Sequence, residues 1–130
     1  MNRMDKPSIP LEFRLDYSTR LREGVDYLVF RALMQGVQVA TVAVYYSPSR
    51  QDRPEPFLFY MGTEEGYQQH GVIGHLVRYV NQYCMEELDS PLFSGTINND
   101  HAIKVWEKLA EDGIVEEFEE KGRRRWRFNV

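Results

Sequence analysis

Residues 57–88, FLFYMGTEEGYQQHGVIGHLVRYVNQYCMEEL, decide the fold. They open with five apolar residues, which is typical of a short buried strand. A polar loop that contains glycines follows, and from Gly71 onward the apolar residues recur at helical spacing as far as Leu88. The next residues, Asp89-Ser-Pro91, predict the end of that helix. A second apolar stretch then begins, so the segment predicts a strand, a helix and a parallel strand.

The flanking sequence predicts further strands and one more helix. A strand is expected over 11–17, where apolar and polar residues alternate, and Ser18 to Gly24 leaves room for one helical turn or a loop. The expected elements are a hairpin of 25–34 and 37–46, a strand over 92–97, a helix capped by Asn99 or Asp100, and a hairpin of 114–120 and 123–128. This order predicts an α/β fold with a mixed, mostly antiparallel sheet and a central β-α-β crossover. We expect residues 1–10 to be a flexible arm and 11–130 to be one domain.

The hairpin of 25–34 and 37–46 is apolar on both faces. Pairing Met34 with Val37 places one set of residues on the first face and another set on the second. A sheet that is apolar on both faces is usually covered on both, which suggests a homodimer. The first set is Leu28, Phe30, Ala32, Val39 and Ala43, and the second is Tyr27, Val29, Val42, Val44 and Tyr46.

Composition and charge exclude several classes of protein. The 130 residues carry a formal net charge of −4 and a pI near 5.4, which argues against binding to nucleic acid or to an anionic membrane surface. The single cysteine excludes an internal disulfide and a cysteine-based zinc site. The longest apolar run, 39–46, is too short to span a bilayer, and MNRMDKPSIP at the start has no apolar core of a signal peptide. We therefore expect a cytoplasmic protein.

Two motifs carry a family resemblance. Tyr67-Gln68-x-x-Gly71-Val72, followed by Leu76, resembles the acyl-CoA signature of the GNAT acyltransferases, although a glycine-bearing turn alone accounts for the local pattern. Downstream, Asn99-x-x-Ala102-x-x-x-Trp106-x-Lys108-Leu109 resembles the second motif of that family. The resemblance covers about residues 25–128 and lies on the expected elements in the expected order.

The resemblance implies a GNAT fold whose N-terminal helices are reduced or absent. It also implies an N-acetyltransferase that binds acetyl-CoA and transfers its acyl group to an amine of a small molecule or a protein. The amine would attack the thioester directly, with a carboxylate or water taking its proton. The implied cofactor-binding residues are Tyr60, Met61, Gln68, Gln69, His70, Gly71, Ile73, Gly74, Asn99 and Trp106.

Three departures from the family pattern leave the activity open. Ile73 stands where the family has glycine or alanine, and its branched side chain is expected to crowd the approach of a phosphate. Trp106 stands at the position of the usual acid, tyrosine, and indole cannot act as a general acid. The two family helices before the second strand are missing. The sequence thus predicts weak or lost acetyl-CoA binding. The alternative is a catalytically degenerate GNAT-fold interaction module of phage or mobile-element origin.

Other reactive side chains are few. Glu64 and Glu65, just past the strand that ends at Met61, are candidates for the base, although they are also what a solvated loop would carry. The three histidines have no ligand spacing supported by a third ligand, so no metal is expected. Cys84 lies on the apolar stripe of the long helix and is expected to be a buried structural thiol.

The C-terminal segment KGRRRWR, 121–127, has two interpretations. Arginines around an aromatic residue are typical of a nucleic-acid patch. Folding of the hairpin around Lys121-Gly122, however, pairs Glu120 with Arg123, Glu119 with Arg124 and Glu116 with Arg127. This cross-strand charge ladder explains the arginines locally, and we favour it.

Overall fold

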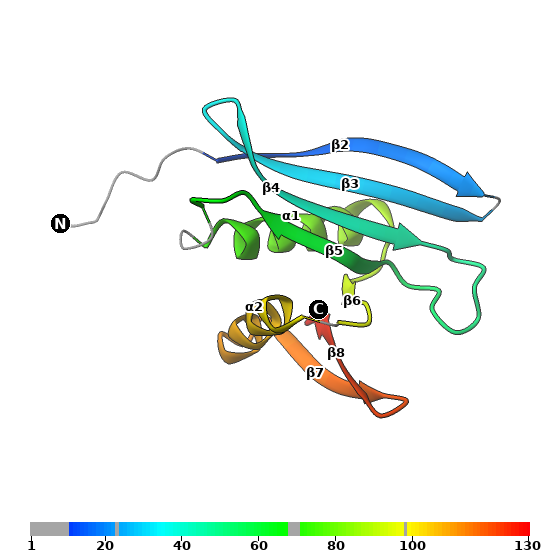
Figure 1. The fold of residues 1–130 in the computed structure, drawn as a ribbon. Helices are drawn as coiled ribbons and strands as arrows, with labels where there is room; N and C mark the ends of the chain where they lie inside the picture. Colours follow the sequence, from blue (N-terminus) through cyan, green and yellow to red (C-terminus); the bar gives the residue numbers. More distant parts are fainter. Residues whose placement is uncertain (1–10, 23, 68–70, 98) are drawn as a thin grey trace.

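Seven strands form one sheet, flanked by two helices, in the computed structural model, which describes residues 11–22, 24–67, 71–97 and 99–130 (Figure 1). The expected arm, 1–10, lies outside the described residues. The sheet order is β2-β3-β4-β5-β6-β8-β7. All neighbours run antiparallel except β5 and β6, which are parallel. In chain order the elements are β2 (Leu11–Arg22), β3 (Val25–Met34), β4 (Val37–Tyr46), β5 (Phe57–Thr63), α1 (Val72–Glu87), β6 (Phe93–Ser94), α2 (Asp100–Glu111), β7 (Val115–Glu120) and β8 (Arg123–Phe128).

The predicted α/β fold and its order of elements are confirmed, with two differences in strand length. The first strand does not stop at Tyr17 but continues to Arg22 along β3, so the polar residues 18–22 form neither a loop nor a helical turn. β6 is much shorter than the expected 92–97, because only Phe93 and Ser94 pair with neighbouring strands in the described chain. The short β6 matters for the site described below.

Both helices lie on the same side of the sheet. α1 buries Leu76, Val77 and Val80, and these join Trp106 of α2 and Trp126 of β8 in one hydrophobic cluster. Crossovers between parallel strands are almost always right-handed, and two that advance in the same direction across a sheet, as from β5 to β6 and from β6 to β7, place their helices on the same face. No helix in the described ranges is long and apolar enough to cross a membrane.

A bulge in β4 overturns the predicted faces of the first hairpin. Leu33 of β3 pairs with Gln38 of β4, and the preceding residue, Ala32, pairs with Ala40. Val39 is therefore an extra residue in β4. A single extra residue turns every later side chain to the opposite face. Val42 and Val44 therefore lie in the core with Leu28 and Phe30, while Ala43 opposes Val29 on the outer face.

The outer face of the sheet carries a cluster of aromatic side chains, which we call the aromatic face. Tyr45 stacks on Phe59 with ring centroids 4.1 Å apart, and Tyr27 contacts both rings. Tyr17 and Tyr60 are about half exposed, at 53% and 52%. No helix within these ranges lies over the aromatic face, so cover from a second copy of the chain, the expected homodimer, stays a prediction. The rings of this face pack against one another.

Candidate functional site

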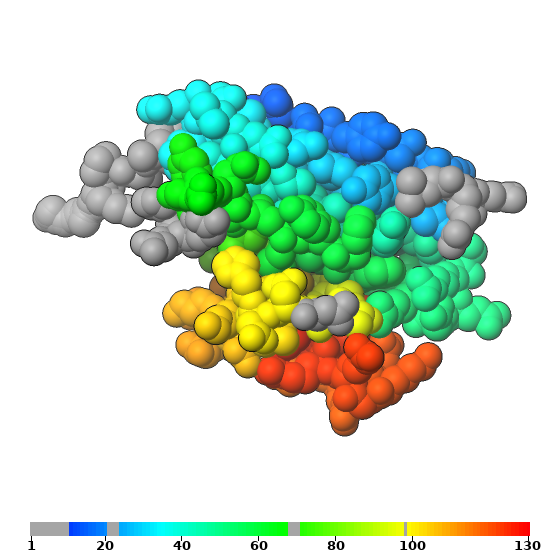
Figure 2. All heavy atoms as spheres, in the orientation of Figure 1, coloured from blue at the N-terminus to red at the C-terminus, as the bar shows by residue number. Residues whose placement is uncertain are grey.

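The parallel strands β5 and β6 separate after a very short contact. Only Phe57 with Phe93 and Leu58 with Ser94 are paired, and the Gly95 amide then donates to the Leu58 carbonyl oxygen at 2.8 Å. β5 continues to Thr63 along β4, whereas residues 95–97 form no strand. β5 and β6 therefore separate, and over 59–62 the edge of β5 that faces β6 has no strand partner among the described residues. Figure 2 shows β5 in green at the middle of the visible face, above the yellow segment that follows β6.

Gly95 sets how closely the two strands meet before they part. A Cβ atom at this position would lie 2.6 Å from the Leu58 carbonyl oxygen and 3.2 Å from the Phe57 ring. Only glycine allows this approach without displacing the backbone. Beyond it, Thr96 and Ile97 line a cleft of about 160 Å³ together with Ile103 and Trp126.

β5 itself is distorted at the point of separation. Its register with β4 shifts between Leu58 and Tyr60, so Phe59 is an extra residue. Bulges of this kind re-aim backbone groups and are common beside active sites. The two expected cofactor residues that follow point in opposite directions, because Met61 packs against the core whereas Tyr60 is exposed.

α1 begins at Gly71, close to the end of β5. Gly71 has φ 68° and ψ 11°, a left-handed conformation that glycine adopts readily, and it makes no side-chain cap. Within this described first turn there is no acidic residue, and a Cβ at Gly74 would meet open space. Among the described residues no side chain caps the first amides of α1, and such amides suit an anion. Three other expected cofactor residues, Gln68, Gln69 and His70, lie outside the described residues.

Ile73 does not occupy the approach to these amides. Its side chain is 6% exposed and belongs to the hydrophobic core. The expectation that Ile73 crowds a phosphate is therefore wrong, since the residue turns its branched side chain inward, away from the solvent side of the first turn. Ile73 contributes to the packing of α1 instead.

The second motif has a structural explanation in α2. Asn99 is the N-cap, as expected for one of the two candidates, and its side-chain oxygen accepts from the Ala102 amide at 2.8 Å. Trp106 is fully buried and stacks on Trp126, with ring centroids 6.3 Å apart and an angle of 14°. Its indole nitrogen has no hydrogen-bond partner among the described residues. Trp106 is therefore a core residue here and not a proton donor.

The two candidate bases lie at the end of β5. Glu64 and Glu65 are exposed in the turn that leads to α1, and the Glu64 amide donates to the Val39 carbonyl oxygen at 2.8 Å. This backbone bond places the turn at the same end of the sheet as the start of α1. His75 and His101 are exposed. Among the described residues no group of three potential ligands gathers around a metal position.

Cys84 is the buried thiol that the sequence predicts. It is fully buried in the core, and burial raises its pKa to about 12. A thiol with so high a pKa stays protonated at neutral pH and is a poor nucleophile. Cys84 therefore has no part in covalent chemistry.

The charge ladder of the C-terminal hairpin is confirmed in register. Glu116 opposes Arg127, Glu119 opposes Arg124 and Glu120 opposes Arg123. The Arg124 side chain does not bond the residue opposite it, Glu119. Its guanidinium group donates instead to Glu117 at 2.8 Å and to Glu107 of α2 at 2.9 Å.

Reversal of Arg124 and Arg127 to Glu should lower the midpoint of thermal unfolding, because like charges would then face Glu117, Glu107 and Glu116. The compensating exchange Arg124→Glu with Glu117→Arg should recover part of the loss. Unchanged stability together with the loss of a measured affinity for nucleic acid would support the nucleic-acid interpretation instead.

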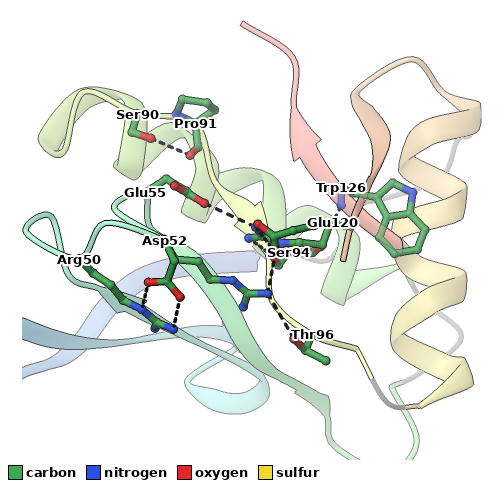
Figure 3. A network of polar contacts seen from close by, with 11 residues as sticks. Arg50, Asp52, Glu55, Ser90, Pro91, Ser94, Thr96, Glu120 and Trp126 are labelled. Carbon is green, nitrogen blue, oxygen red and sulfur yellow. Dashed lines mark hydrogen bonds and ion pairs between the residues drawn. The ribbon is translucent and has the colours of Figure 1, made fainter. Parts of the chain in front are cut away.

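Sequence reasoning missed a buried arginine in this hairpin. Arg125 is 2% exposed, and two nitrogens of its guanidinium group donate to the Ser94 carbonyl oxygen, Nε at 2.8 Å and Nη2 at 2.5 Å. A third nitrogen, Nη1, lies 3.3 Å from Glu120 and 3.5 Å from Glu55 (Figure 3). The available signal was its place in the ladder, since Arg125 alone of the four hairpin arginines opposes an aromatic residue, Phe118.

The ion pairs of Glu120 should make the stability of the fold depend on pH in the acid range. Burial raises the pKa of its carboxyl group, but the hydrogen bonds and charges of Arg53 and Arg125 outweigh this and lower it below the ordinary 4.5. The stabilising contribution is therefore complete above about pH 4.5 and is lost as the pH falls through the folded-state pKa. We expect Glu120→Gln to reduce the acid-induced loss of stability, measured by urea unfolding between pH 7 and pH 3. An unchanged pH dependence would contradict this assignment.

Comparison with known proteins identifies this arrangement. No family model and no curated protein sequence matches the chain, but solved structures of acetyltransferases do. The ribosomal-protein-S18-alanine N-acetyltransferase of Escherichia coli is 20% identical, with 78% of this chain and 65% of that chain covered and a TM-score of 0.51. A GNAT-family acetyltransferase of Staphylococcus aureus is 19% identical, with 79% and 67% covered and a TM-score of 0.56.

A Bacillus subtilis acetyltransferase in complex with CoA is 13% identical, with 93% of this chain and 99% of that chain covered and a TM-score of 0.62. The chain thus spans slightly less than two thirds of the Escherichia coli protein but nearly all of the Bacillus subtilis one. The chain also has the mixed, mostly antiparallel sheet with two helices that was expected for such a protein. The protein has the fold of the GNAT acetyltransferases.

Proposed function

We propose that this protein binds an acyl-CoA, with acetyl-CoA as the first choice, and transfers the acyl group to an amine. The observation that carries the proposal is the separation of β5 and β6 beside the start of α1. A strand edge that has no strand partner over 59–62 among the described residues and a helix start without a side-chain cap lie at the same end of the sheet. This combination suits a ligand with an extended amide-containing arm and a diphosphate, which is the chemistry of CoA. A GNAT-fold protein in complex with CoA supports it.

Each part of the ligand has residues that suit it. The diphosphate would accept hydrogen bonds from the first amides of α1, where Gly71 and Gly74 keep the backbone accessible. The arm would pair with the edge of β5 over 59–62, and an amide near the Phe59 bulge would donate to the thioester carbonyl oxygen. The residues present therefore fit an acyl-CoA.

The reaction needs little acid catalysis from the protein. The amine nitrogen attacks the thioester carbonyl carbon, the carbon–sulfur bond breaks, and the sulfur leaves as a thiolate. A thiol has a pKa of about 8.5, so its thiolate leaves readily and can take a proton from water. The buried Trp106 is then no obstacle to transfer. The proton that the amine loses would pass to water or to Glu64 or Glu65, which lie at the end of β5.

The acceptor is an amine on a small molecule or a protein, and its site would lie toward the aromatic face. Tyr60 and Phe59 are exposed on that face directly beside the separation of β5 and β6. Since no helix in the described ranges covers it, an acceptor could approach without a lid having to open.

Isothermal titration calorimetry with acetyl-CoA tests the proposal. We expect a dissociation constant on the order of tens to hundreds of micromolar. The variant Gly74→Ala should raise helix stability by up to about 1 kcal/mol, since glycine is the poorer helix former. The same methyl group should weaken binding, because it protrudes where the diphosphate would lie. Absence of heat at millimolar ligand in the wild-type protein would reject the proposal.

A specific observation favours one second candidate, an interaction module without catalysis. The aromatic face has the makeup of a protein interface, with stacked rings and the ion pair Arg31–Asp16 on the same face. A homodimer through this face would shelter Tyr17 and Tyr60. Light scattering that shows a dimer, together with a failed acetyl-CoA titration, would support this second function over the first.

A further inference from the structure

The burial of Arg125 needs an explanation that the acyl-CoA site described so far does not give. Arginine is almost never buried this fully unless it is paired. Its guanidinium group lies 5.4 Å from the Phe93 ring centroid and 5.5 Å from that of Phe118. Two carboxylates, Glu55 and Glu120, neutralise it. Arg125, Glu55 and Glu120 thus form a cluster of charged side chains beside the end of β6.

The strongest contacts of Arg125 are to Ser94, the last residue of β6. Both of its bonds below 3 Å go to the Ser94 carbonyl oxygen, and the Ser94 hydroxyl accepts from the Trp126 amide at 2.9 Å. Both oxygens of Ser94 are therefore bound from β8. On the opposite edge, the following residue, Gly95, makes the last bond to β5. Ser94 and Gly95 together are the point at which β6 leaves β5.

A second arginine, Arg53, contacts the chain just after the point at which β5 and β6 separate. Arg53, in the segment between β4 and β5, donates from Nη2 to Glu120 at 3.0 Å and to the Thr96 hydroxyl at 3.3 Å. Figure 3 shows Glu55, Ser94, Thr96 and Glu120 in one network of polar contacts. Arg53, which also lies over the Phe57 ring of β5, thereby links Thr96 to Glu120 of β7. The charged network thus adds to the strand pairing of Ser94 and Gly95 with Leu58 and continues it to Thr96, where strand pairing has ended.

We propose that Arg125 is a positioning residue for the acyl-CoA arm: by binding the Ser94 carbonyl oxygen it fixes where β6 separates from β5 and so determines the opening that the arm enters. This inference rests on the proposed function. It goes beyond it by assigning the opening to a buried arginine on β8, which would not itself touch the ligand. Arg125 acts through Ser94 and Gly95.

The test compares two ligands and two matched variants. Arg125→Met removes the hydrogen bonds to the Ser94 carbonyl oxygen and fills the space between Phe93 and Phe118 with an apolar side chain of similar length. Arg127→Met is the control, because Arg127 lies on the same face of β8, is exposed and pairs with Glu116. The ligands are acetyl-CoA, which has the arm, and adenosine 3′,5′-bisphosphate, which lacks it. Affinities are measured by calorimetry.

We expect Arg125→Met to weaken acetyl-CoA binding roughly tenfold or more, while bisphosphate binding changes less than about twofold. Arg127→Met should leave both affinities within about twofold. Equal losses for the two ligands in Arg125→Met would mean a merely structural role, and unchanged affinities would mean no role. Either result overturns the inference, while a wild-type protein that does not bind acetyl-CoA overturns the proposed function.

Hydrogen exchange of the ligand-free protein gives an independent readout. In Arg125→Met the Gly95 amide should exchange faster, relative to amides in the middle of α1, than it does in Arg127→Met. Should Arg125→Met not fold, Arg125→Lys keeps the positive charge but has one donor nitrogen in place of three, and it is measured in the same way. Equal relative exchange at Gly95 in the variant and the control would contradict the inference even if no ligand binds.

Discussion

Replacing Trp106 with alanine should lower the free energy of unfolding by about 3–5 kcal/mol, the usual cost of truncating a large buried aromatic residue. Trp106 is fully buried between α2 and β8, where it stacks on Trp126 and meets the edge of Phe128. The alanine variant would leave a cavity between α2 and the C-terminal hairpin. Urea unfolding monitored by circular dichroism measures the loss.

Trp106→Phe is the matched control for this prediction. It keeps an aromatic ring in the cluster and removes an indole N–H that has no partner among the described residues. A buried donor without a partner costs about 1–3 kcal/mol, so its removal offsets part of the lost packing. We expect the phenylalanine variant to be clearly more stable than the alanine variant. Equal stability of the alanine variant and the wild type would show that Trp106 is not buried.

The second large effect is expected at the start of α1. Gly71→Val should reduce acetyl-CoA affinity at least about a hundredfold. A left-handed conformation costs a non-glycine residue roughly 1–2 kcal/mol, and valine is among the residues that tolerate it least. The backbone at φ 68° would therefore relax, and the first amides of α1 would turn away from the diphosphate. Calorimetry measures the change.

Gly36→Val separates this local effect from a general loss of stability. Gly36 also has a left-handed backbone, with φ 81°, and open space around it, but it lies in the turn between β3 and β4. Its replacement should cost stability by the same mechanism while leaving acetyl-CoA affinity within about threefold. Similar affinity losses in both variants would argue against a role of Gly71 in binding.

The fold was largely predictable because each element has a strong local signal. The hairpin turns at Gln35-Gly36 and Lys121-Gly122 both adopt the left-handed backbone that such turns require. What failed were features without a local signal. The bulge at Val39 depends on how β3 and β4 twist together, and the extension of β2 over polar residues depends on pairing with β3.

The candidate site was predictable in outline and not in detail. The loop before α1 follows from the motif, whereas the early separation of β5 and β6 was not predicted, because the apolar residues of 92–97 favour a longer strand than the one present. The direction of the Ile73 side chain was not predictable from the motif, because a residue in the first turn of a helix can point to the core or to solvent. The expected crowding of a phosphate assumed that it points to solvent. The role of Arg125 depends on Ser94 and Glu55, which lie 31 and 70 residues before it in the sequence.

Chemical-shift mapping in an acetyl-CoA titration of the ¹⁵N-labelled protein tests the central claim most directly. If the ligand lies between β5 and β6, the largest shifts should fall on the amides of 59–63, 71–74 and 95–97. The amides of β2 and β7 should hardly move, because these strands lie at the two edges of the sheet. Shifts that instead concentrate on β2 and β3, or a spectrum that does not change at millimolar acetyl-CoA, would contradict the assignment of this opening as an acyl-CoA site.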